Sequence, residues 1–417
     1  MVPNGWEWTN LGKLANKVGS GVTPKGGSNS YKSSGIPLIR SQNVLWGTLD
    51  LKDVAFIDDS QHEKMKGSVV CKGDVLLNIT GASIGRAAVS NLDEANVNQH
   101  VCIIRSDKLD PEFLRDFLLS FNGQKQIEQF QAGGNRQGLN FEQIKSFKLP
   151  LPPLSEQRKI AKILSTWDKA ISTTECLIDN SKQQKKALMQ QLLTGKKRLL
   201  DDSGKPFEGE WEDLYLQDVA KIIVSPVDKK IVEGEIPVEL CNYTDVYYNT
   251  RITNSIEFMK ATAKQSEIDK YTLQVNDVII TKDSETPGDI AIPALVSEDL
   301  GGTVCGYHLA IIRPNSQLVE GAYLNYLFSM QKTRYYFFTL ATGATRFGLS
   351  IGGINKAHFT LPPLEEQQKI ASVLVNADQE IELLEQQLAD LKQEKKALMQ
   401  QLLTGKRRVK TDDKEVA

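Results

Sequence analysis

The chain has 417 residues, 40% of them hydrophobic and 24% charged, a composition that excludes an intrinsically disordered protein and a length that favours two or more domains. The formal net charge is −2, and the five scattered cysteines form no CxxC pair, which excludes a disulfide framework and a cysteine zinc site. No apolar run reaches the roughly 18 residues that cross a bilayer and the start lacks the features of a signal peptide, so we expect a cytoplasmic protein.

The first block, residues 1–150, combines predicted short strands with helices. Runs at 35–39, 74–77 and 101–104 are rich in β-branched residues and lie between Gly- and Asn-rich turns. A helix is predicted over 111–129, with Asp110 as its cap and Pro111 and Glu112 in its first turn. We therefore expect a mixed α/β (α+β) domain.

Residues 151–198 form a long predicted helix. Apolar residues recur at alternating steps of four and three from Ile160 through Leu164 to Trp167, which is the heptad seam of a coiled coil. A Pro-Pro pair at 152–153 suits its start and Gly195 suits its end, so the helix would be roughly 60 Å long at 1.5 Å per residue. Lys185 falls on the seam, where its ammonium group must snorkel or find a partner.

The second variable block, residues 199–360, has the same kind of pattern but a different charge. Residues 201–360 contain 14 Lys and Arg against 22 Asp and Glu, whereas residues 1–150 contain 17 against 15. A helix is predicted over 320–333. If this block binds nucleic acid, it must use a local basic patch, because its net charge opposes binding.

Residues 361–408 repeat the first long helix. The segment 185–196 recurs unchanged at 395–406, and 28 of 48 positions are identical between 151–198 and 361–408, at a constant offset of 210. We expect the two helices to pack as an antiparallel coiled coil that relates the two halves by a pseudo-twofold axis; a generic homodimerising coiled coil is the alternative. Lys395 repeats Lys185 on the seam. The predicted division is 1–150, 151–198, 199–360, 361–408 and a charged C-terminal tail at 409–417.

No motif in the chain indicates catalysis. Both Pro-Pro pairs lie between leucines, which lack the hydrogen-bonding side chain that N6-adenine methyltransferases place before a Pro-Pro-aromatic turn. No GxGxxG follows a predicted strand, and no GxxxxGK[ST] is present. The four histidines, at 62, 100, 308 and 358, lack metal-ligand spacing, so no metal site is expected. His100 and His308 are duplicated, and we interpret both as packed beside strands.

The paired helix motifs resemble those of a known family. The opening LPPLxEQ(R/Q)KIA and the ending KKALMQQLLTGK(K/R)R, each present twice, are similar to the specificity subunit of type I restriction-modification enzymes. The short segments WEW at 6–8, SGxTP at 20–24, GIP at 35–37 and TGASIGR at 80–86 resemble the first target-recognition domain of that family. The resemblance covers essentially the whole chain.

The resemblance implies two target-recognition domains, at 1–150 and 199–360, each reading one half of a split DNA target. It implies that the spacer helices at 151–198 and 361–408 fix the gap and dock two modification (methyltransferase) subunits. Two restriction subunits would add translocation and cleavage. S-adenosylmethionine, ATP and Mg would belong to those partners, and this chain would carry no catalytic residues and no cofactor.

Base readout uses Arg or Lys for guanine and Asn or Gln for adenine, and these residue types occur near the predicted turns. The DNA-binding candidates are Ser20, Thr23, Lys25, Arg40, Gln42, Asn43, Asn78, Thr80, Ser83, Arg86, Asn98, Gln99, Arg136, Lys282, Ser284 and Arg346. The second block replaces TGASIGR with TKDSET at 281–286, so we expect an asymmetric bipartite target. Arg136 and Arg346 lie in matching Gly-rich turns, where a phosphate contact and a structural bond to a turn carbonyl both remain open.

Two further alternatives remain open. The variable blocks could instead bind proteins, which would make the chain a coiled-coil adaptor, and the acidic second block favours that hypothesis. The basic clusters at 196–198 and 406–408 could contact phosphates or partner acids, or could be the cationic ends of helices that the macrodipole favours.

Overall fold

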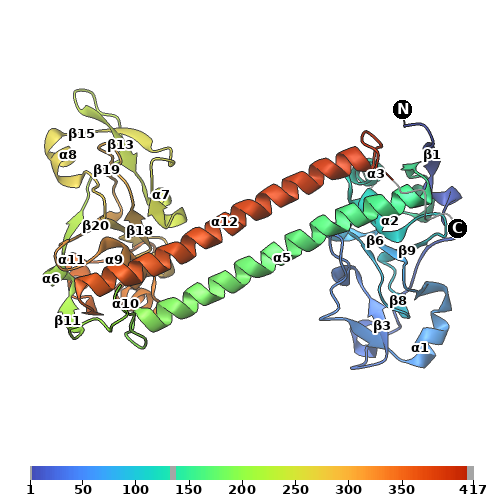
Figure 1. The fold of residues 1–417 in the computed structure, drawn as a ribbon, viewed down its shortest axis with the longest axis horizontal. Helices are drawn as coiled ribbons and strands as arrows, with labels where there is room; N and C mark the ends of the chain where they lie inside the picture. Colours follow the sequence, from blue (N-terminus) through green and yellow to red (C-terminus); the bar gives the residue numbers. More distant parts are fainter. Residues whose placement is uncertain (1, 132–137, 411–417) are drawn as a thin grey trace. The chain divides into compact units, whose positions relative to one another are not determined.

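The computed structural model describes residues 2–131 and 138–410, and its residues fall into two compact units. Unit 1 comprises Met1–Cys176 and Gln386–Ala417, and unit 2 comprises Leu177–Glu385. Each unit therefore contains part of both long helices, α5 (Leu154–Leu192) and α12 (Leu364–Leu402), both of which are labelled in Figure 1. The five-part division of the sequence stays a prediction.

Unit 1 contains two four-stranded sheets and a two-stranded ribbon. The first sheet has the order β2-β9-β6-β7 and is antiparallel throughout; the second has the order β4-β3-β8-β5, with β3 and β8 parallel. The strands are β1 (Glu7–Asn10), β2 (Lys17–Ser20), β3 (Ile36–Ile39), β4 (Ala55–Ile57), β5 (Val69–Val70), β6 (Val75–Asn78), β7 (Ala87–Val89), β8 (Ala95–Val97), β9 (Val101–Arg105) and β10 (Lys148–Leu151). Strand β1 pairs with β10. The helices, besides the long ones, are α1 (Asp59–Lys64), α2 (Pro111–Leu119), α3 (Phe121–Gln131) and α4 (Phe141–Lys145).

Unit 2 repeats this topology with one strand more in its first sheet and one strand fewer in its second. Its first sheet has the order β12-β20-β16-β18-β14, and its second has the order β15-β13-β19, again with one parallel pair, β13 and β19. The strands are β11 (Glu212–Tyr215), β12 (Ala220–Val224), β13 (Ile236–Cys241), β14 (Arg251–Ile252), β15 (Met259–Ala263), β16 (Val278–Thr281), β17 (Asp283–Ser284), β18 (Pro293–Val296), β19 (Val304–Cys305), β20 (Leu309–Pro314), β21 (Phe347–Gly348) and β22 (His358–Leu361). The helices are α6 (Leu216–Val219), α7 (Tyr243–Tyr248), α8 (Gln265–Tyr271), α9 (Gly321–Ser329), α10 (Gln331–Leu340) and α11 (Ile351–Asn355).

The predicted single helix over 111–129 is two helices. Ser120 has an extended backbone (φ −69°, ψ 162°) between α2 and α3. Helix α3 then packs against the end of α2 so closely that a Cβ on Gly123 would lie 2.2 Å from the carbonyl oxygen of Phe117. Unit 2 repeats the break at Met330, between α9 and α10. The sequence prediction was wrong in both blocks because one extended residue leaves the apolar pattern unchanged. The Asp110 cap was predicted correctly, since its carboxylate accepts a hydrogen bond from the amide of Phe113.

Each unit buries the start of one long helix and the end of the other. In unit 1, Ile160 and Leu164 of α5 share a core with Leu402 of α12 and with residues of α2, β6 and β9. In unit 2 the roles are reversed, and Ile370 of α12 shares a core with Leu192 of α5. Within each unit the two helix segments are therefore antiparallel, which confirms the predicted pairing of the long helices.

The seam lysines form ion pairs. In unit 1, Lys395 of α12 contacts Asp168 of α5 (Nζ–Oδ1 2.5 Å). In unit 2, Lys185 of α5 contacts Asp378 of α12, which is the same pair shifted by 210 residues. The prediction that each seam lysine needs a partner is confirmed.

The basic clusters that follow the long helices contain a structural arginine. Arg198 donates to the buried carboxylate of Glu366 (Nη2–Oε2 2.6 Å), and Arg408 contacts Glu156 in the equivalent place. Each arginine also donates to a backbone carbonyl, of Gly209 or of Asn4. These two side chains therefore hold the turn after each helix against the domain beside it.

Candidate nucleic-acid interface

Four segments of unit 1 meet at the end of its first sheet where strands β2 and β6 finish. Ser20 of β2 and Asn78 of β6 are paired with Cys102 and Val101 of β9, so both strands end where β9 begins. The segment after β2 is joined to the turn before β9 by a hydrogen bond from the amide of Gly21 to the carbonyl of Asn98 (3.2 Å). We call residues 20–25, 79–86, 98–100 and 138–140 the loop end of unit 1.

Side chains connect the segments of this loop end. The ring of His100 contacts Thr80 through Nδ1 (2.5 Å to Oγ1), and its Nε2 contacts the side-chain amide of Gln99 (2.9 Å). Gln99 in turn contacts the hydroxyl of Thr23. A backbone bridge between Thr80 and Gly138 brings in the fourth segment. The result is a polar surface built from loops that are far apart in the sequence.

Unit 2 has an equivalent loop end with different side chains. It consists of residues 224–227, 282–292, 306–308 and 342–349, and it is joined by a hydrogen bond from the amide of Tyr307 to the carbonyl of Val227 (2.7 Å). Strands β17 and β21 pair Asp283 with Gly348, and among the described residues of unit 1 the bridge between Thr80 and Gly138 lies at the corresponding place. The ring of His308 contacts Asp283 (Nδ1–Oδ2 3.1 Å), and Lys282 contacts the other oxygen of this carboxylate (2.5 Å).

Most of the predicted DNA-binding residues lie at these loop ends. The exposed ones are Thr23, Lys25, Gln99 and Arg346, and the half-buried ones are Ser20, Thr80, Ser83, Arg86 and Lys282. Arg40 and Gln42 lie on the turn after β3, which Asn78 ties to the end of β6 by donating to the carbonyl of Ser41 (2.8 Å). Arg136 lies outside the described residues.

Four of the residues predicted to contact DNA are buried. Asn43 is 2% exposed and donates to the carbonyls of Asp50 and Asp53 while accepting from the amide of Arg40. Asn78 is fully buried, and Asn98 is 7% exposed and accepts from the amide of His100. Ser284 is 8% exposed beside the Tyr243 hydroxyl (3.2 Å). Because these polar groups already hold the turns together, they are not available to a base edge in this conformation.

Two other residues predicted to contact DNA are accessible to solvent but already bonded to Asp53. The guanidinium of Arg40 donates to the carbonyl of Asp53 (2.9 Å) and lies over the ring of Tyr31 at 5.4 Å. Gln42 donates to the carboxylate of Asp53 (3.0 Å). A DNA contact by either side chain would have to replace its bond to Asp53.

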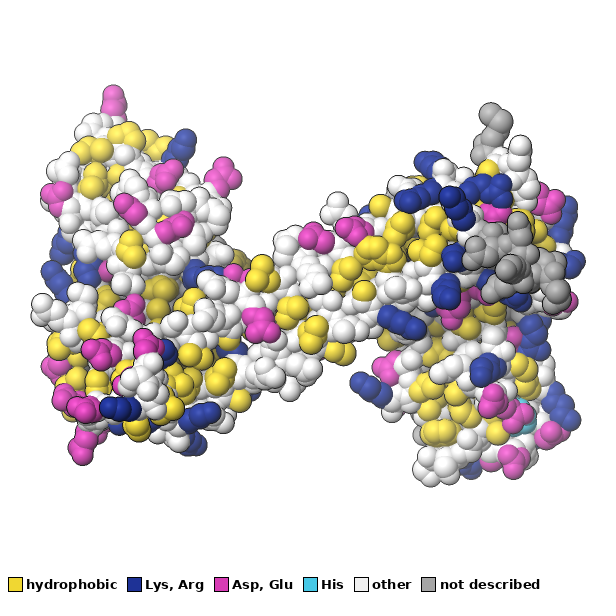
Figure 2. Space-filling view, viewed as in Figure 1, with side chains coloured by type: hydrophobic (Ala, Val, Ile, Leu, Met, Phe, Trp, Pro, Cys, Tyr) yellow, Lys and Arg dark blue, Asp and Glu magenta, His cyan; other side chains and the backbone are white. Residues whose placement is uncertain are grey.

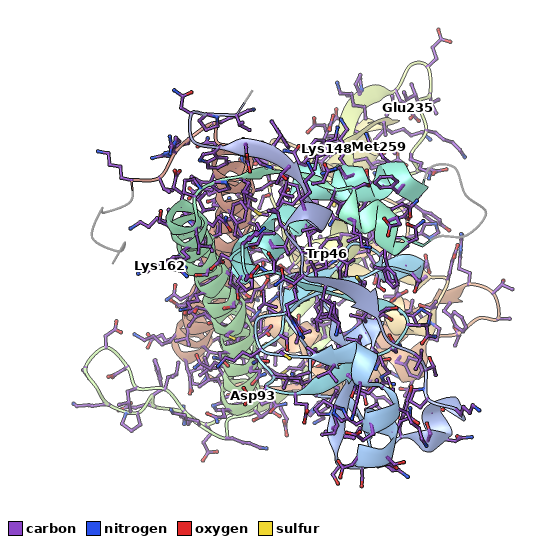
Figure 3. The ribbon with its side chains drawn as sticks, turned by 90° about the vertical axis from the view of Figure 1, so that its right-hand side faces the viewer. Trp46, Asp93, Lys148, Lys162, Glu235 and Met259 are labelled. Atoms are coloured by element: carbon purple, nitrogen blue, oxygen red, sulfur yellow. The ribbon has the colours of Figure 1, made fainter. Side chains whose placement is uncertain are left out.

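Sequence reasoning missed two exposed aromatic residues at matching places. Trp46, labelled in Figure 3, is 58% exposed, and Tyr248 is 77% exposed. Each follows a fully buried valine by two residues: Val44 comes after the turn that follows β3, and Val246 lies in α7, which follows β13. The offset between them is 202 rather than 210, because insertions shift the halves here, so the repeat alone could not have aligned them.

Two tyrosines and an arginine of unit 2 lie beside its loop end and have shifted pKa values. In unit 2 the carboxylate of Asp289 raises the pKa of the Tyr247 hydroxyl, and burial raises that of Tyr243, so both phenols stay neutral. Burial lowers the pKa of Arg334, whose guanidinium donates to the carbonyl of Gly288 (2.6 Å). Figure 2 shows the wider contrast on one face: Lys and Arg side chains are frequent over unit 1, while Asp and Glu are spread over unit 2.

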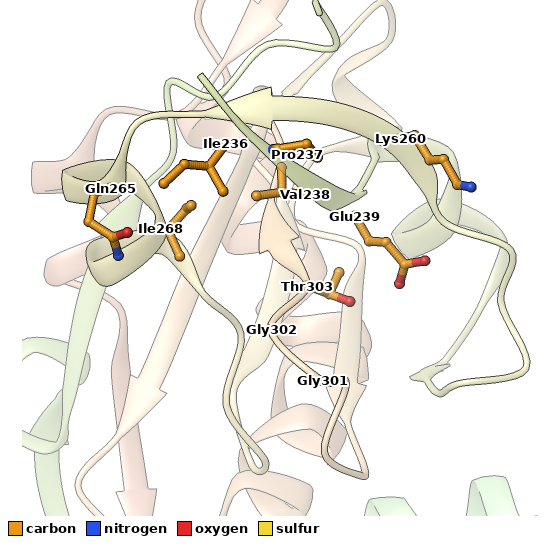
Figure 4. A pocket seen from close by; sticks show the side chains of 10 residues that line it. All are labelled: Ile236, Pro237, Val238, Glu239, Lys260, Gln265, Ile268, Gly301, Gly302 and Thr303. Carbon is orange, nitrogen blue, oxygen red and sulfur yellow. The ribbon is translucent and has the colours of Figure 1, made fainter. Parts of the chain in front are cut away.

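A hollow of about 600 Å³ lies on the second sheet of unit 2. Figure 4 shows its walls, which come from β13, β15, α8 and the turn at Gly301 and Gly302. It is not formed by the loop end. Among residues 2–131 and 138–410, no cluster of three His, Cys, Asp or Glu side chains could hold a metal ion, and no helix is both long and apolar enough to cross a membrane.

The duplicated architecture agrees with the comparisons with known proteins. The family profile described as "Type I restriction modification DNA specificity domain" matches residues 3–180 and again residues 208–393. The chain belongs to this family. The two matches fall on the two halves that the repeat defines.

Named relatives agree with this assignment. The chain is 28% identical over 433 residues to the putative type I restriction enzyme MjaX specificity subunit of Methanocaldococcus jannaschii, covering 98% of this chain and 95% of the relative. It is 23% identical to the type I restriction enzyme EcoKI specificity subunit of Escherichia coli, covering 88% and 81%. Both relatives are matched over most of their length.

Solved structures show the same fold. The HsdS subunit from Thermoanaerobacter tengcongensis superposes with a TM-score of 0.52 at 20% identity, covering 97% of this chain and 98% of that one. The S subunit of a type I restriction-modification system from M. genitalium gives 0.58 at 13% identity, covering 96% of each. This likeness confirms the predicted fold class, two mixed α/β domains joined to long helices.

Proposed function

We propose that this chain is the DNA-recognition subunit of a type I restriction-modification complex, and that each loop end reads one half of a split DNA target. The observation that carries the proposal is the pairing of one scaffold with two different loop ends. Both halves match the same specificity-domain family, and the order of the four strands in the first sheet of unit 1 recurs in the first sheet of unit 2. A protein that reads two different half-sites needs this combination.

The side chains at the loop ends support an asymmetric target. At equivalent places unit 1 has Thr80 and Gln99, whereas unit 2 has Asp283 and Tyr307. Groups with different donors and acceptors favour different base edges in the major groove. Unit 2 is acidic overall and Lys282 is paired with Asp283, which leaves the exposed Arg346 as the basic side chain of its loop end for a phosphate contact.

The long helices suit a partner that binds twice. The segments 151–198 and 361–408 are identical at 28 of 48 positions, and their ion pairs recur at an offset of 210. Two equal surfaces can dock two copies of one partner, here two modification subunits, while fixing the gap between the half-sites. Two restriction subunits would join this assembly. S-adenosylmethionine, ATP and Mg would be bound by these partners, this chain would take no part in bond making, and it would act on DNA in the cytoplasm.

Selection from random DNA tests the proposal. The chain, assembled with its modification subunit, is incubated with a pool of random duplexes, and the bound duplexes are sequenced. We expect enrichment of one motif with two specified half-sites separated by unspecified bases. The modification subunit alone is the control and should enrich nothing.

The acidic second block leaves the protein-binding adaptor as a rival. An adaptor would enrich no motif from the pool although the modification subunit is folded and bound. That result would reject DNA recognition and favour the adaptor.

A further inference from the structure

Two duplicated histidines are held in the same way by different neighbours. His100 directly precedes β9, and His308 directly precedes β20. The Nδ1 atom of His100 contacts Thr80 in the loop after β6 (2.5 Å), and that of His308 contacts Asp283 after β16 (3.1 Å). Fixing one ring nitrogen orients the other. In both units Nε2 is therefore the atom left for a second contact.

His308 has a backbone that only a few residue types adopt easily. Its φ is 74°, in the left-handed region that strains a residue with a side chain. The turn is fixed on both sides, because the amide of Gly306 donates to the carbonyl of Cys241 (2.8 Å) and that of Tyr307 to Val227 (2.7 Å). Strain held in this way fixes the direction of the His308 ring, which is 27% exposed.

The contact with Asp283 also fixes the tautomer. A carboxylate only accepts, so Nδ1 of His308 carries the hydrogen and donates it to Asp283. Lys282 contacts the other oxygen of that carboxylate and supplies its counter-charge. In the neutral imidazole with its hydrogen on Nδ1, Nε2 has a lone pair, and this atom takes part in no hydrogen bond to the described residues.

We propose that Nε2 of His308 reads a base of the second half-site by accepting a hydrogen bond from the exocyclic amino group of adenine or cytosine. Asp283 is the positioning residue that sets the tautomer and the ring direction, and the exposed Tyr307 (48%) covers the contact from the side, its ring centre 4.0 Å from that of His308. This inference rests on the proposed function and adds the residue and the chemistry of one contact.

Unit 1 uses the same position differently. There Nε2 of His100 is occupied by the amide of Gln99 (2.9 Å), and Gln99 also contacts Thr23. The exposed group at this position is therefore an amide rather than an imidazole. Equivalent positions that present different groups give the two units different base preferences.

The test uses two substitutions that separate the ring nitrogens. His308→Asn tolerates the left-handed backbone and keeps a short amide that can donate to Asp283, but it lacks any atom at the place of Nε2. His308→Gln has a longer side chain whose amide reaches the Nε2 position. His358→Asn, on the exposed end of β22, is the matched control.

The measurement is the affinity of the complex with its modification subunit for duplexes in which each base pair of the selected target is replaced in turn. We expect His308→Asn to lose roughly tenfold discrimination at one position of the second half-site and none in the first. We expect His308→Gln to recover part of it, and His358→Asn to match the unsubstituted complex.

The outcomes separate the inference from the proposed function. If the unsubstituted complex discriminates in both half-sites and His308→Asn does so equally well at every position, the His308 contact is rejected while the recognition role stands. A loss in the first half-site, or a uniform loss at all positions, also rejects it. If the unsubstituted complex does not discriminate between duplexes at all, the proposed function fails, and the contact with it. Unchanged thermal unfolding of both His308→Asn and His308→Gln guards against misfolding as the cause of a loss.

Discussion

In unit 1 the Asp74 carboxylate accepts two hydrogen bonds from Arg105 (2.7 Å each), and in unit 2 Asp277 accepts the same two from Arg313 (2.8 and 2.7 Å). Both aspartates are 1% exposed. At the loop ends the two duplicated histidines keep the contact through Nδ1 but change its partner, from Thr80 in unit 1 to Asp283 in unit 2. The comparison shows that the scaffold repeats this aspartate–arginine pair with both residues unchanged, whereas the loop end repeats the histidine and changes the side chain that holds it.

The largest predicted effect is a loss of folding stability when the arginine–glutamate pair after either long helix is broken, and we expect the loss to differ between the two units. Glu366→Ala should leave Arg198 without its carboxylate and lower the free energy of unfolding by about 2–3 kcal/mol, less than for a fully buried pair because Arg198 is 33% exposed. Glu156→Ala should cost about 1 kcal/mol more, because Glu156 also accepts from the indole of Trp6 (3.2 Å). In unit 2 the equivalent indole nitrogen, Nε1 of Trp211, is buried and has no hydrogen-bond partner among the described residues.

Chemical denaturation of the two variants measures this difference. Glu365→Ala, which removes an exposed carboxylate next to Glu366, is the control and should change stability by less than about 0.5 kcal/mol. Equal losses for Glu156→Ala and Glu366→Ala would show that the Trp6 contact adds nothing.

A second difference lies between α2 and α9, where Asp116 is replaced by Tyr326. Burial raises the pKa of Asp116 to about 6, against the opposing effect of Arg115, and its Oδ2 atom has no partner among the described residues. The folded state therefore binds this proton more tightly than the unfolded state does. The stabilising contribution is complete below about pH 4 and is lost as the pH rises through about 6.

We expect unit 1 to lose on the order of 2 kcal/mol of stability between pH 4 and pH 7 through this group. Asp116→Asn should abolish that loss. Tyr326, which donates to Asp378 (2.6 Å), does not titrate in this range because burial raises its pKa far above it. Denaturation of both proteins across this pH range measures the effect. A pH dependence that survives in Asp116→Asn would assign it to another group.

The seam lysines offer a smaller contrast. Lys185→Met should lower the free energy of unfolding by about 1 kcal/mol, because Lys185 pairs with Asp378 and also lies over the ring of Tyr326 at 5.3 Å. Lys395→Met should cost about 0.5 kcal/mol, because Asp168 is 41% exposed and keeps a contact with Arg115 (3.5 Å). Double-mutant cycles with Asp378→Asn and Asp168→Asn give the two pair energies, and a larger value for the unit 1 pair would contradict this order.

The smallest predicted effect is on DNA binding. Arg346→Ala removes an exposed charge from the loop end of unit 2 and should weaken binding about threefold to fivefold on any sequence, with a salt dependence reduced by about one charge. Lys356→Ala, an exposed lysine near the end of α11, is the control. A loss confined to the target sequence would assign Arg346 to base readout instead of phosphate contact.

The same comparison explains what the sequence could predict. Strands β3, β6 and β9, the Asp110 cap and the partners required by Lys185 and Lys395 follow from local patterns and from the exact repeat, and the structure confirms them. Asn43 and Asn78 have the residue type that reads adenine, but the fold uses them to hold turns. Only coordinates could separate the two uses, because both need the same side chain near a turn.

The role that we propose for His308 could not be predicted from the sequence, for the opposite reason. Its duplication with His100 was visible in the sequence, yet a histidine before a strand gives no sign of its partner, 25 residues earlier, or of its left-handed backbone. The offset between the halves also changes from 210 to 208 at this position, so the repeat no longer aligns the loops that surround it.

The most direct test of the account is methylation mapping in a host that expresses this chain with its modification subunit, with deletion of this chain as the control. The account predicts one adenine-methylation motif, split into two half-sites of different sequence, that disappears on deletion. A palindromic motif would contradict the claim that the two loop ends read different bases. A methylation pattern unchanged by deletion, with the modification subunit active, would contradict DNA recognition by this chain.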